Sequence, residues 1–131
     1  MDNSEEIPQG EIVLRTLAMP ADTNANGDIF GGWLLAQMDI AGGMAAKSTS
    51  HGRIATVAID AMTFHKPVFV GDAVCCYALV ERIGNTSMTI RVQAWVIRQA
   101  VGNERIKVTE GVFTYVAIDK GRKPRAVLAA S

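Results

Sequence analysis

Hydrophobic and polar positions alternate along most of the chain, with a period of two residues. The alternation is clearest in residues 87–98, where one face would carry Met88, Ile90, Val92, Ala94 and Val96, and the other Ser87, Thr89, Arg91, Gln93 and Trp95. Such a pattern is typical of an antiparallel sheet with one face buried and the other in solvent. We therefore predict strands at residues 11–18, 54–64, 73–82, 87–98 and 106–118.

Residues 29–46 break this pattern because they are apolar almost without interruption. Leu, Met, Ala and Gln favour a helix, and the segment is longer than an ordinary strand. Because apolar residues surround the helix on nearly all sides, we expect it to be buried on most of them. A membrane span is the alternative at about 18 apolar residues, but the charged Asp39 and several glycines argue against it.

The order of the elements indicates the architecture. One strand, a loop of turn residues at 21–28 and the long helix come first, and a polar connector at 47–53 leads to four strands. Gly84-Asn85 is a hairpin signal. We predict an α+β fold in which one curved antiparallel sheet wraps around one long central helix. An uncovered edge strand and part of the helix would favour pairing of two subunits.

Composition limits the function classes. A chain of 131 residues has room for about one domain. We predict a domain at 11–119 between a polar, mobile leader at 1–10 and a basic tail at 120–131. Zero net charge argues against a nucleic-acid binder. The acidic start lacks the features of a signal peptide. The adjacent Cys75 and Cys76 cannot form an unstrained disulfide with each other. Together these observations predict a cytoplasmic protein that does not bind membranes.

Asp39 is the first candidate for chemistry. Burying an ionised carboxylate costs several kcal/mol unless it is paired, so its position in an apolar helix needs a reason. It could act as a general base or a nucleophile. Alternatively, it is a structural carboxylate bonded to nearby backbone or to an arginine.

Gly31-Gly32 at the predicted helix start is the second candidate. Helix N-termini expose N–H donors, and glycine lets a carbonyl oxygen approach closely, as an oxyanion hole requires. Tight helix–sheet packing is the alternative. Gly32 and Asp39 lie about 10 Å apart along a helix axis, so we predict that one subunit's helix start faces the partner's Asp39.

Two segments carry a family resemblance. Residues 18–33 (AMPADTNANGDIFGGW), followed by Gln37-Met38-Asp39, resemble the hotdog-fold acyl-CoA thioesterases of the bacterial YciA type, and residues 63–72 (TFHKPVFVGD) are similar to a second block of that family. The resemblance covers about residues 14–118. It implies hydrolysis of fatty acyl-CoA to free acid and CoA, a homodimer formed through the sheet, and assembly as a trimer of dimers.

The resemblance also implies residue roles. Asp39 would be the catalytic general base for water or, alternatively, a nucleophile that forms an anhydride. Asn24 would orient water or the thioester carbonyl and complete the partner's site, unless it is simply a turn residue. N–H groups near Gly31 and Gly32 would form the oxyanion hole.

Coenzyme A requires cations for its phosphates and an apolar channel for the acyl chain. Arg53 and Lys66 are the candidate phosphate ligands, although both could be solvated surface cations, and Trp33 is a packing residue near the acyl channel. The tail at 120–125 is expected to be solvated, with contact to CoA as the alternative. CoA is part of the substrate, so no cofactor is expected. His51 and His65 lack metal-ligand spacing with Cys75 and Cys76, which predicts no metal site.

Two other functions remain open. A hydratase of the same architecture would need a paired Asp and His in one loop. A non-catalytic acyl-CoA-binding or regulatory module would not need a catalytic carboxylate. The presence of both Asp39 and Asn24 favours catalysis, and acyl-chain preference is left open.

Overall fold

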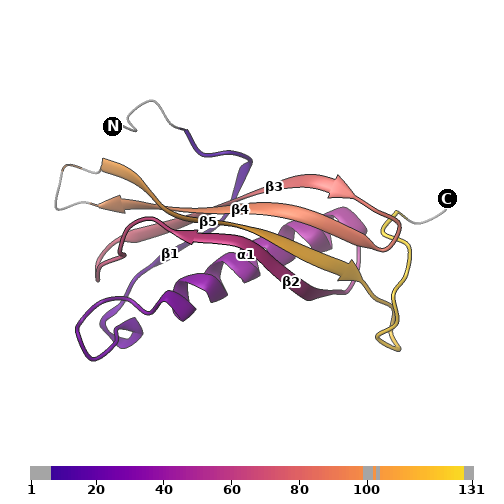
Figure 1. Ribbon diagram of the computed structural model, residues 1–131, viewed down its shortest axis with the longest axis horizontal. Coiled ribbons are helices and arrows are strands. Elements are labelled where there is room, and N and C mark those ends of the chain that lie inside the picture. Colours follow the sequence, from indigo (N-terminus) through magenta and orange to yellow (C-terminus); the bar gives the residue numbers. More distant parts are fainter. Residues whose placement is uncertain (1–6, 99–101, 103, 129–131) are drawn as a thin grey trace.

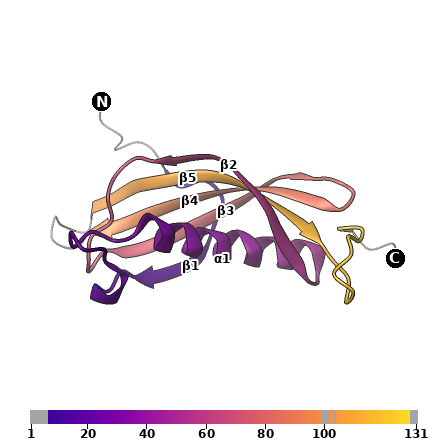
Figure 2. The same cartoon turned by 60° about the horizontal axis from the view of Figure 1, so that its bottom comes forward.

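The computed structural model describes residues 7–98, 102 and 104–128. Its elements in chain order are β1 (Glu11–Leu17), the 3₁₀ helix η1 (Pro20–Asp22), α1 (Gly31–Ser50), β2 (Ile54–Phe64), β3 (Ala73–Ile83), β4 (Ser87–Arg98) and β5 (Glu104–Ala117). The strands form one antiparallel sheet in the order β1-β3-β4-β5-β2. Helix α1 lies lengthwise along one face of this curved sheet (Figures 1 and 2). The predicted α+β architecture is confirmed.

Helix α1 starts and ends later than the predicted residues 29–46. Before it, the N–H groups of Ile29 and Phe30 are held outside the helix by the carbonyls of Val68 and Asp22. After residue 46 the side chains become polar but the helix continues to Ser50, where His51 adopts a left-handed conformation at φ 56°. The predicted connector therefore contributes the last helical turn, in which Lys47 and Ser48 are exposed and Ser50 is buried, because polar residues can also continue a helix.

The core lies between α1 and the facing side of the sheet. The five residues predicted for the inner face of β4 are all fully buried: Met88, Ile90, Val92, Ala94 and Val96. They pack with Leu34, Met38 and Ala41 of the helix. One side of α1 stays uncovered in the single chain, where Ile40 and Met44, one helical turn apart, are about half exposed.

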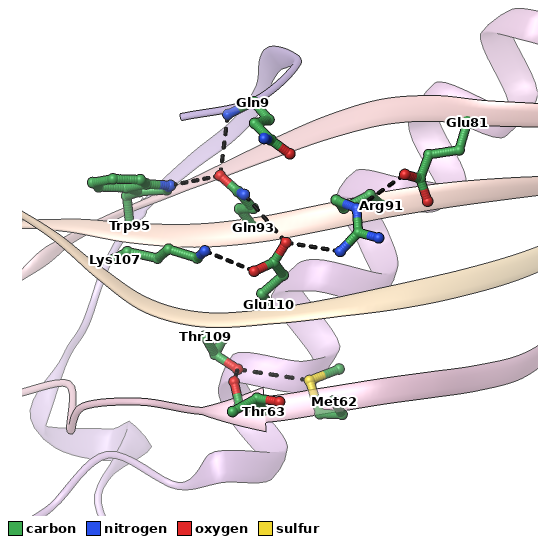
Figure 3. Close-up of polar contacts among 10 residues, drawn as sticks. All are labelled: Gln9, Met62, Thr63, Glu81, Arg91, Gln93, Trp95, Lys107, Thr109 and Glu110. Atoms are coloured by element: carbon green, nitrogen blue, oxygen red, sulfur yellow. Dashed lines mark hydrogen bonds and ion pairs between the residues drawn. The ribbon is translucent and has the colours of Figure 1, made fainter. Parts of the chain in front are cut away.

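The outer face of the sheet differs from the prediction of a solvated surface. Gln93 and Trp95 are buried there. The Gln93 side-chain oxygen accepts hydrogen bonds from the Trp95 indole at 3.0 Å and from the Gln9 N–H at 3.1 Å (Figure 3). Thus part of the predicted leader lies against the sheet, and residues 1–6 are outside the described residues.

Beside Gln93, charged side chains link β3, β4 and β5. Arg91 contacts Glu81 at 3.1 Å and Glu110 at 2.8 Å, and Lys107 contacts Glu110 at 2.7 Å (Figure 3). Burial by itself would raise the pKa of Glu110, but hydrogen bonds from Lys107, Arg91 and Gln93 outweigh it and lower the pKa to about 2. Glu110 is therefore ionised throughout the physiological range.

Residues 120–124 of the predicted basic tail are exposed, as expected of a solvated segment, but the tail is also hydrogen-bonded to the domain. Its first residues form a turn in which the Asp119 carboxylate accepts the N–H groups of Gly121 and Lys123 at 2.8 and 3.0 Å. The Arg125 guanidinium then donates to the carbonyls of Ile118 and Ser50 at 3.1 and 3.2 Å. The segment thus closes over the end of α1, while residues 129–131 lie outside the described residues.

None of the helices within the described ranges combines the length and apolar character needed to span a lipid bilayer.

Candidate active site

Asp39 is half-buried in the middle of α1, and two hydroxyl groups hold its carboxylate. Thr56 donates to Oδ1 at 2.8 Å, and Tyr115 donates to the same oxygen at 3.0 Å and to the Asp39 carbonyl at 2.9 Å. Within the described part of the chain, no group donates a hydrogen bond to Oδ2. The carboxylate is thus fixed in place with one oxygen left for another molecule, and none of the arginines in the described ranges forms an ion pair with it.

Strand register brings the two hydroxyls together. Thr56 of β2 and Tyr115 of β5 are directly opposite each other in the sheet, so both side chains project toward the helix. The Tyr115 ring is fully buried and stacks with Phe113 at a centroid distance of 6.3 Å. Burial, together with the charge of Asp39 and the hydrogen bond to it, raises the pKa of Tyr115. Tyr115 therefore remains a protonated donor. Neither residue could be predicted from the sequence pattern, because strand register is not a local property.

The start of α1 is open. No side chain caps the helix at Phe30, and Gly31 and Gly32 are exposed. The first N–H groups of a helix have no acceptor within it and carry the positive end of its dipole. A Cβ atom at Gly32 would meet nothing within 4 Å, so packing in this chain does not require glycine there. The geometry leaves these donors accessible to a developing negative charge.

Asn24 organises the loop before the helix. Its side-chain oxygen accepts the N–H groups of Asn26 at 2.9 Å and Asp28 at 3.2 Å, and its own N–H donates to the Asp28 carbonyl at 2.7 Å. Asn24 is therefore a turn residue, as the structural alternative predicted. Its NH₂ group, however, has no acceptor among the residues that the structure describes, so it can still donate to a ligand.

A pocket of about 310 Å³ opens beside the helix start. It is lined by Ile29, Phe30, Gly31, Leu34, Phe64, His65, Lys66, Pro67 and Val68. Among the predicted site residues, Gly31 and Lys66 therefore share this pocket. Asp39, Asn24 and Gly32 do not line it, and Trp33 instead packs half-buried against the core. In one chain the structure does not bring all the predicted residues together.

An ion pair that the sequence analysis missed holds the pocket loop. Asp72 is buried, accepts the Phe69 N–H at 2.9 Å and pairs with Arg98 at 2.8 Å. The Arg98 guanidinium also donates to the Pro67 carbonyl at 3.2 Å and lies 4.6 Å from the Phe69 ring centroid. The only signal in the sequence was the Gly71-Asp72 turn, which does not reveal the distant arginine.

The two candidate phosphate ligands lie far apart in the single chain. Arg53 directly precedes β2, whereas Lys66 follows its last residue, Phe64. A strand of 11 residues spans about 35 Å, so both cations cannot contact one phosphate from the same chain. In the described segments, no group of three or more His, Cys, Asp or Glu residues could hold a metal ion.

Known proteins resemble this chain over almost its full length. Residues 26–102 match the family model of the Thioesterase superfamily. The acyl-CoA thioester hydrolase YciA of Escherichia coli (strain K12) is 55% identical over 130 residues, covering 97% of this chain and 98% of the relative. The crystal structure of the hexameric thioesterase y2039 from Yersinia pestis is 57% identical with a TM-score of 0.88, covering 95% of this chain and 100% of that chain. The structure of HI0827, a hexameric broad specificity acyl-coenzyme A thioesterase, is 48% identical with a TM-score of 0.90, covering 95% and 85%.

Proposed function

The chain belongs to the thioesterase superfamily, among the hotdog acyl-CoA thioester hydrolases of the YciA type, and from this premise we propose that it hydrolyses acyl-CoA to a free acid and CoA. The observation that carries the proposal is the Asp39 carboxylate. It is half-buried and held through Oδ1 by two hydroxyls, while Oδ2 has no hydrogen-bond donor among the described residues. A fixed carboxylate with one unused oxygen suits a general base.

Asp39 takes a proton from a water molecule, and the water oxygen attacks the thioester carbonyl carbon. The carbonyl oxygen gains negative charge, which the N–H groups near Gly31 and Gly32 stabilise at the start of a helix. When the C–S bond breaks, CoA leaves as the thiolate and takes up the proton from Asp39. The products are one carboxylic acid and one CoA thiol, so the carboxylate is regenerated for the next turnover.

Asn24 would act through its NH₂ group. Because its side-chain oxygen is already used by two backbone N–H groups of the loop, the amide is oriented to donate rather than to accept. A donor of this kind suits the thioester carbonyl better than it suits the attacking water, since the water must give its proton to a base. Asn24 therefore adds to the oxyanion-stabilising donors.

We propose that each site is built by two subunits. Gly32 and Asp39 of one helix are separated by about 10 Å along its axis, too far to contact one carbonyl group. Strand β2 is a sheet edge on which Val57 is 57% exposed, and Ile40 and Met44 of α1 are about half exposed. A second copy pairing along β2 would cover this apolar surface, and three such dimers would give the hexamer described for the thioesterases of known structure.

Antiparallel pairing of β2 with the β2 of a second copy would also bring the two candidate phosphate ligands, Arg53 and Lys66, close together. The start of one β2 strand would then lie beside the end of the other, so Arg53 of the partner subunit would approach Lys66. Lys66 borders the pocket, whose other walls are mostly apolar. This arrangement suits the phosphates of CoA at the rim and the uncharged part of the substrate within.

We further propose that the protein is cytoplasmic and that it needs no cofactor, since CoA is part of the substrate. Cys75 and Cys76 are neighbours on β3, and both are free and buried. Burial raises the pKa of the Cys76 thiol to about 12, which keeps it protonated and unreactive. Such thiols suit a reducing compartment.

The proposal is tested by measuring CoA thiol release from short, medium and long acyl-CoA. Wild type is compared with Asp39→Asn and with Glu11→Gln, an exposed carboxylate changed in the same way. We expect turnover by wild type and Glu11→Gln and a loss of about 100-fold or more in Asp39→Asn, because an amide cannot accept the water proton. Binding of acyl-CoA without turnover by wild type would instead support a non-catalytic binding module. Full turnover by Asp39→Asn would reject Asp39 as the base.

A further inference from the structure

We propose that Tyr115 is a positioning residue for the reaction: it determines that Oδ2 of Asp39 is the oxygen that accepts the proton, and the absence of a side chain at Gly42 allows it to do so. This inference rests on the proposed role of Asp39 as the base. Nothing in the family match or in the similarity to solved thioesterases assigns a role to either residue.

The two carboxylate oxygens of Asp39 are hydrogen-bonded unequally. Oδ1 receives the Tyr115 hydroxyl at 3.0 Å and the Thr56 hydroxyl at 2.8 Å, whereas the described residues provide no donor to Oδ2. Hydrogen bonds to a charged carboxylate oxygen stabilise its negative charge and make that oxygen a poorer proton acceptor. The proton from water is therefore directed to Oδ2.

Tyr115 is enclosed by the core, whereas Thr56 lies at the surface. The Tyr115 side chain is fully buried and stacked on Phe113, whereas Thr56 is exposed on an edge strand. The Tyr115 hydroxyl also contacts the backbone carbonyl of Asp39 at 2.9 Å, so it is placed relative to both the backbone and the carboxylate of the same residue. Its raised pKa keeps it a donor, so the geometry does not change with pH.

Helix α1 leaves room for the Tyr115 hydroxyl. Gly42 is buried in α1, one turn after Asp39, and a Cβ atom there would collide with the Tyr115 hydroxyl. The adjacent Gly43 is different, because a Cβ atom there would meet Ile54 at 3.5 Å and the Tyr115 ring at 3.8 Å, which are ordinary contacts. Glycine is unfavourable inside a helix, so the space at Gly42 has a specific use.

The experiment compares Tyr115→Phe, Gly42→Ala and Gly43→Ala with wild type in full kinetics over a range of pH. Tyr115→Phe removes only the hydroxyl oxygen and retains the buried ring. We expect kcat to fall roughly 10- to 100-fold in Tyr115→Phe and Gly42→Ala, with KM changed by less than about threefold. The acid limb of the kcat profile should move to higher pH, because a donor to the carboxylate has been lost. Gly43→Ala is the matched control and should retain wild-type kcat.

A second measurement separates positioning from a general loss of packing. In the Asp39→Asn background, Tyr115→Phe should cause no further loss of turnover, because the tyrosine acts through the carboxylate that has been removed. A further loss of the same size as in wild type would overturn the proposal, as would unchanged kcat and an unmoved acid limb in Tyr115→Phe. If Asp39→Asn itself kept full turnover, the base assignment in the proposed function would fail instead, so the two failures are distinguishable.

Discussion

Glu110 illustrates how single residues stabilise this fold at the outer face of the sheet. Its carboxylate is shared by Lys107, Arg91 and Gln93, which come from β4 and β5, and Arg91 continues the network to Glu81 of β3. The three donors lower the pKa of Glu110 to about 2 from an ordinary value of 4.5. Because its pKa is lowered in the folded state, ionised Glu110 stabilises the fold above about pH 4.5, and this contribution is lost as the pH falls toward 2.

The corresponding prediction concerns acid stability. Glu110→Gln should lower the free energy of unfolding at pH 7 by about 1–2 kcal/mol, allowing for partial solvent screening, and should make it depend less on pH below pH 4.5. Urea unfolding at pH 7, 4.5 and 3 measures this, with the exposed Glu11→Gln as the control. If the free energy of unfolding fell equally steeply with pH in wild type and Glu110→Gln, the lowered pKa of Glu110 would be contradicted.

At the scale of elements, the two ends of α1 contact different parts of the chain. The loop organised by Asn24 leads into the start of the helix, which no side chain caps. At the other end, Arg125 donates to the Ser50 and Ile118 carbonyls and thereby joins the helix to the segment that follows β5. The start of α1 thus keeps its N–H groups uncapped, whereas its end is hydrogen-bonded to the segment that follows β5.

We therefore expect Arg125→Ala to destabilise the protein without changing its catalysis. The loss should be about 1–3 kcal/mol, because a charged donor to helix carbonyls is removed. Thermal and urea unfolding measure the change, and kcat and KM at 25 °C should stay near wild type. Lys123→Ala, which removes an exposed cation two residues away, should leave stability unchanged. A wild-type melting temperature in Arg125→Ala would show that the closure contributes nothing.

At the scale of the whole molecule, the proposed mechanism requires more than a single chain provides. The proposed base, Asp39, lies in the middle of the helix, the proposed oxyanion-stabilising donors lie at the helix start, and apolar surface is exposed along β2 and one side of α1. A two-fold dimer through β2 would cover the exposed apolar surface. It would also bring the helix start of each subunit close to the Asp39 carboxylate of its partner.

This arrangement predicts complementation between inactive variants. Asn24→Ala and Asp39→Asn should each have little activity alone. When equal amounts are unfolded together and refolded, half of the dimers are mixed and half of their sites are intact, so about a quarter of wild-type activity should return. CoA release from the refolded mixture measures this against each variant refolded alone. Absence of recovery, with mixed dimers demonstrated by differently tagged chains, would place the whole site within one chain.

Several features of this protein could be derived from its sequence. Period-two alternation identified the strands, with the ranges of β2 and β4 matching residue for residue, and a continuous apolar run identified the helix. Asp39 could be singled out because it is the only charge in that run, and Asn24, Gly31 and Gly32 through their family pattern. These features are local: they depend on neighbouring residues along the chain, which the sequence displays directly.

Other features were decided only by the tertiary structure. Thr56 and Tyr115 meet at Asp39 because β2 and β5 pair in one particular register, although Tyr115 is 76 residues from Asp39. Gln93 is buried by the segment containing Gln9, and Arg98 holds a loop through Asp72, 26 residues away. Each depends on contacts between distant segments, which local periodicity does not encode. The sequence therefore determined the elements and singled out Asp39, whereas packing and register decided which groups surround its carboxylate and orient it.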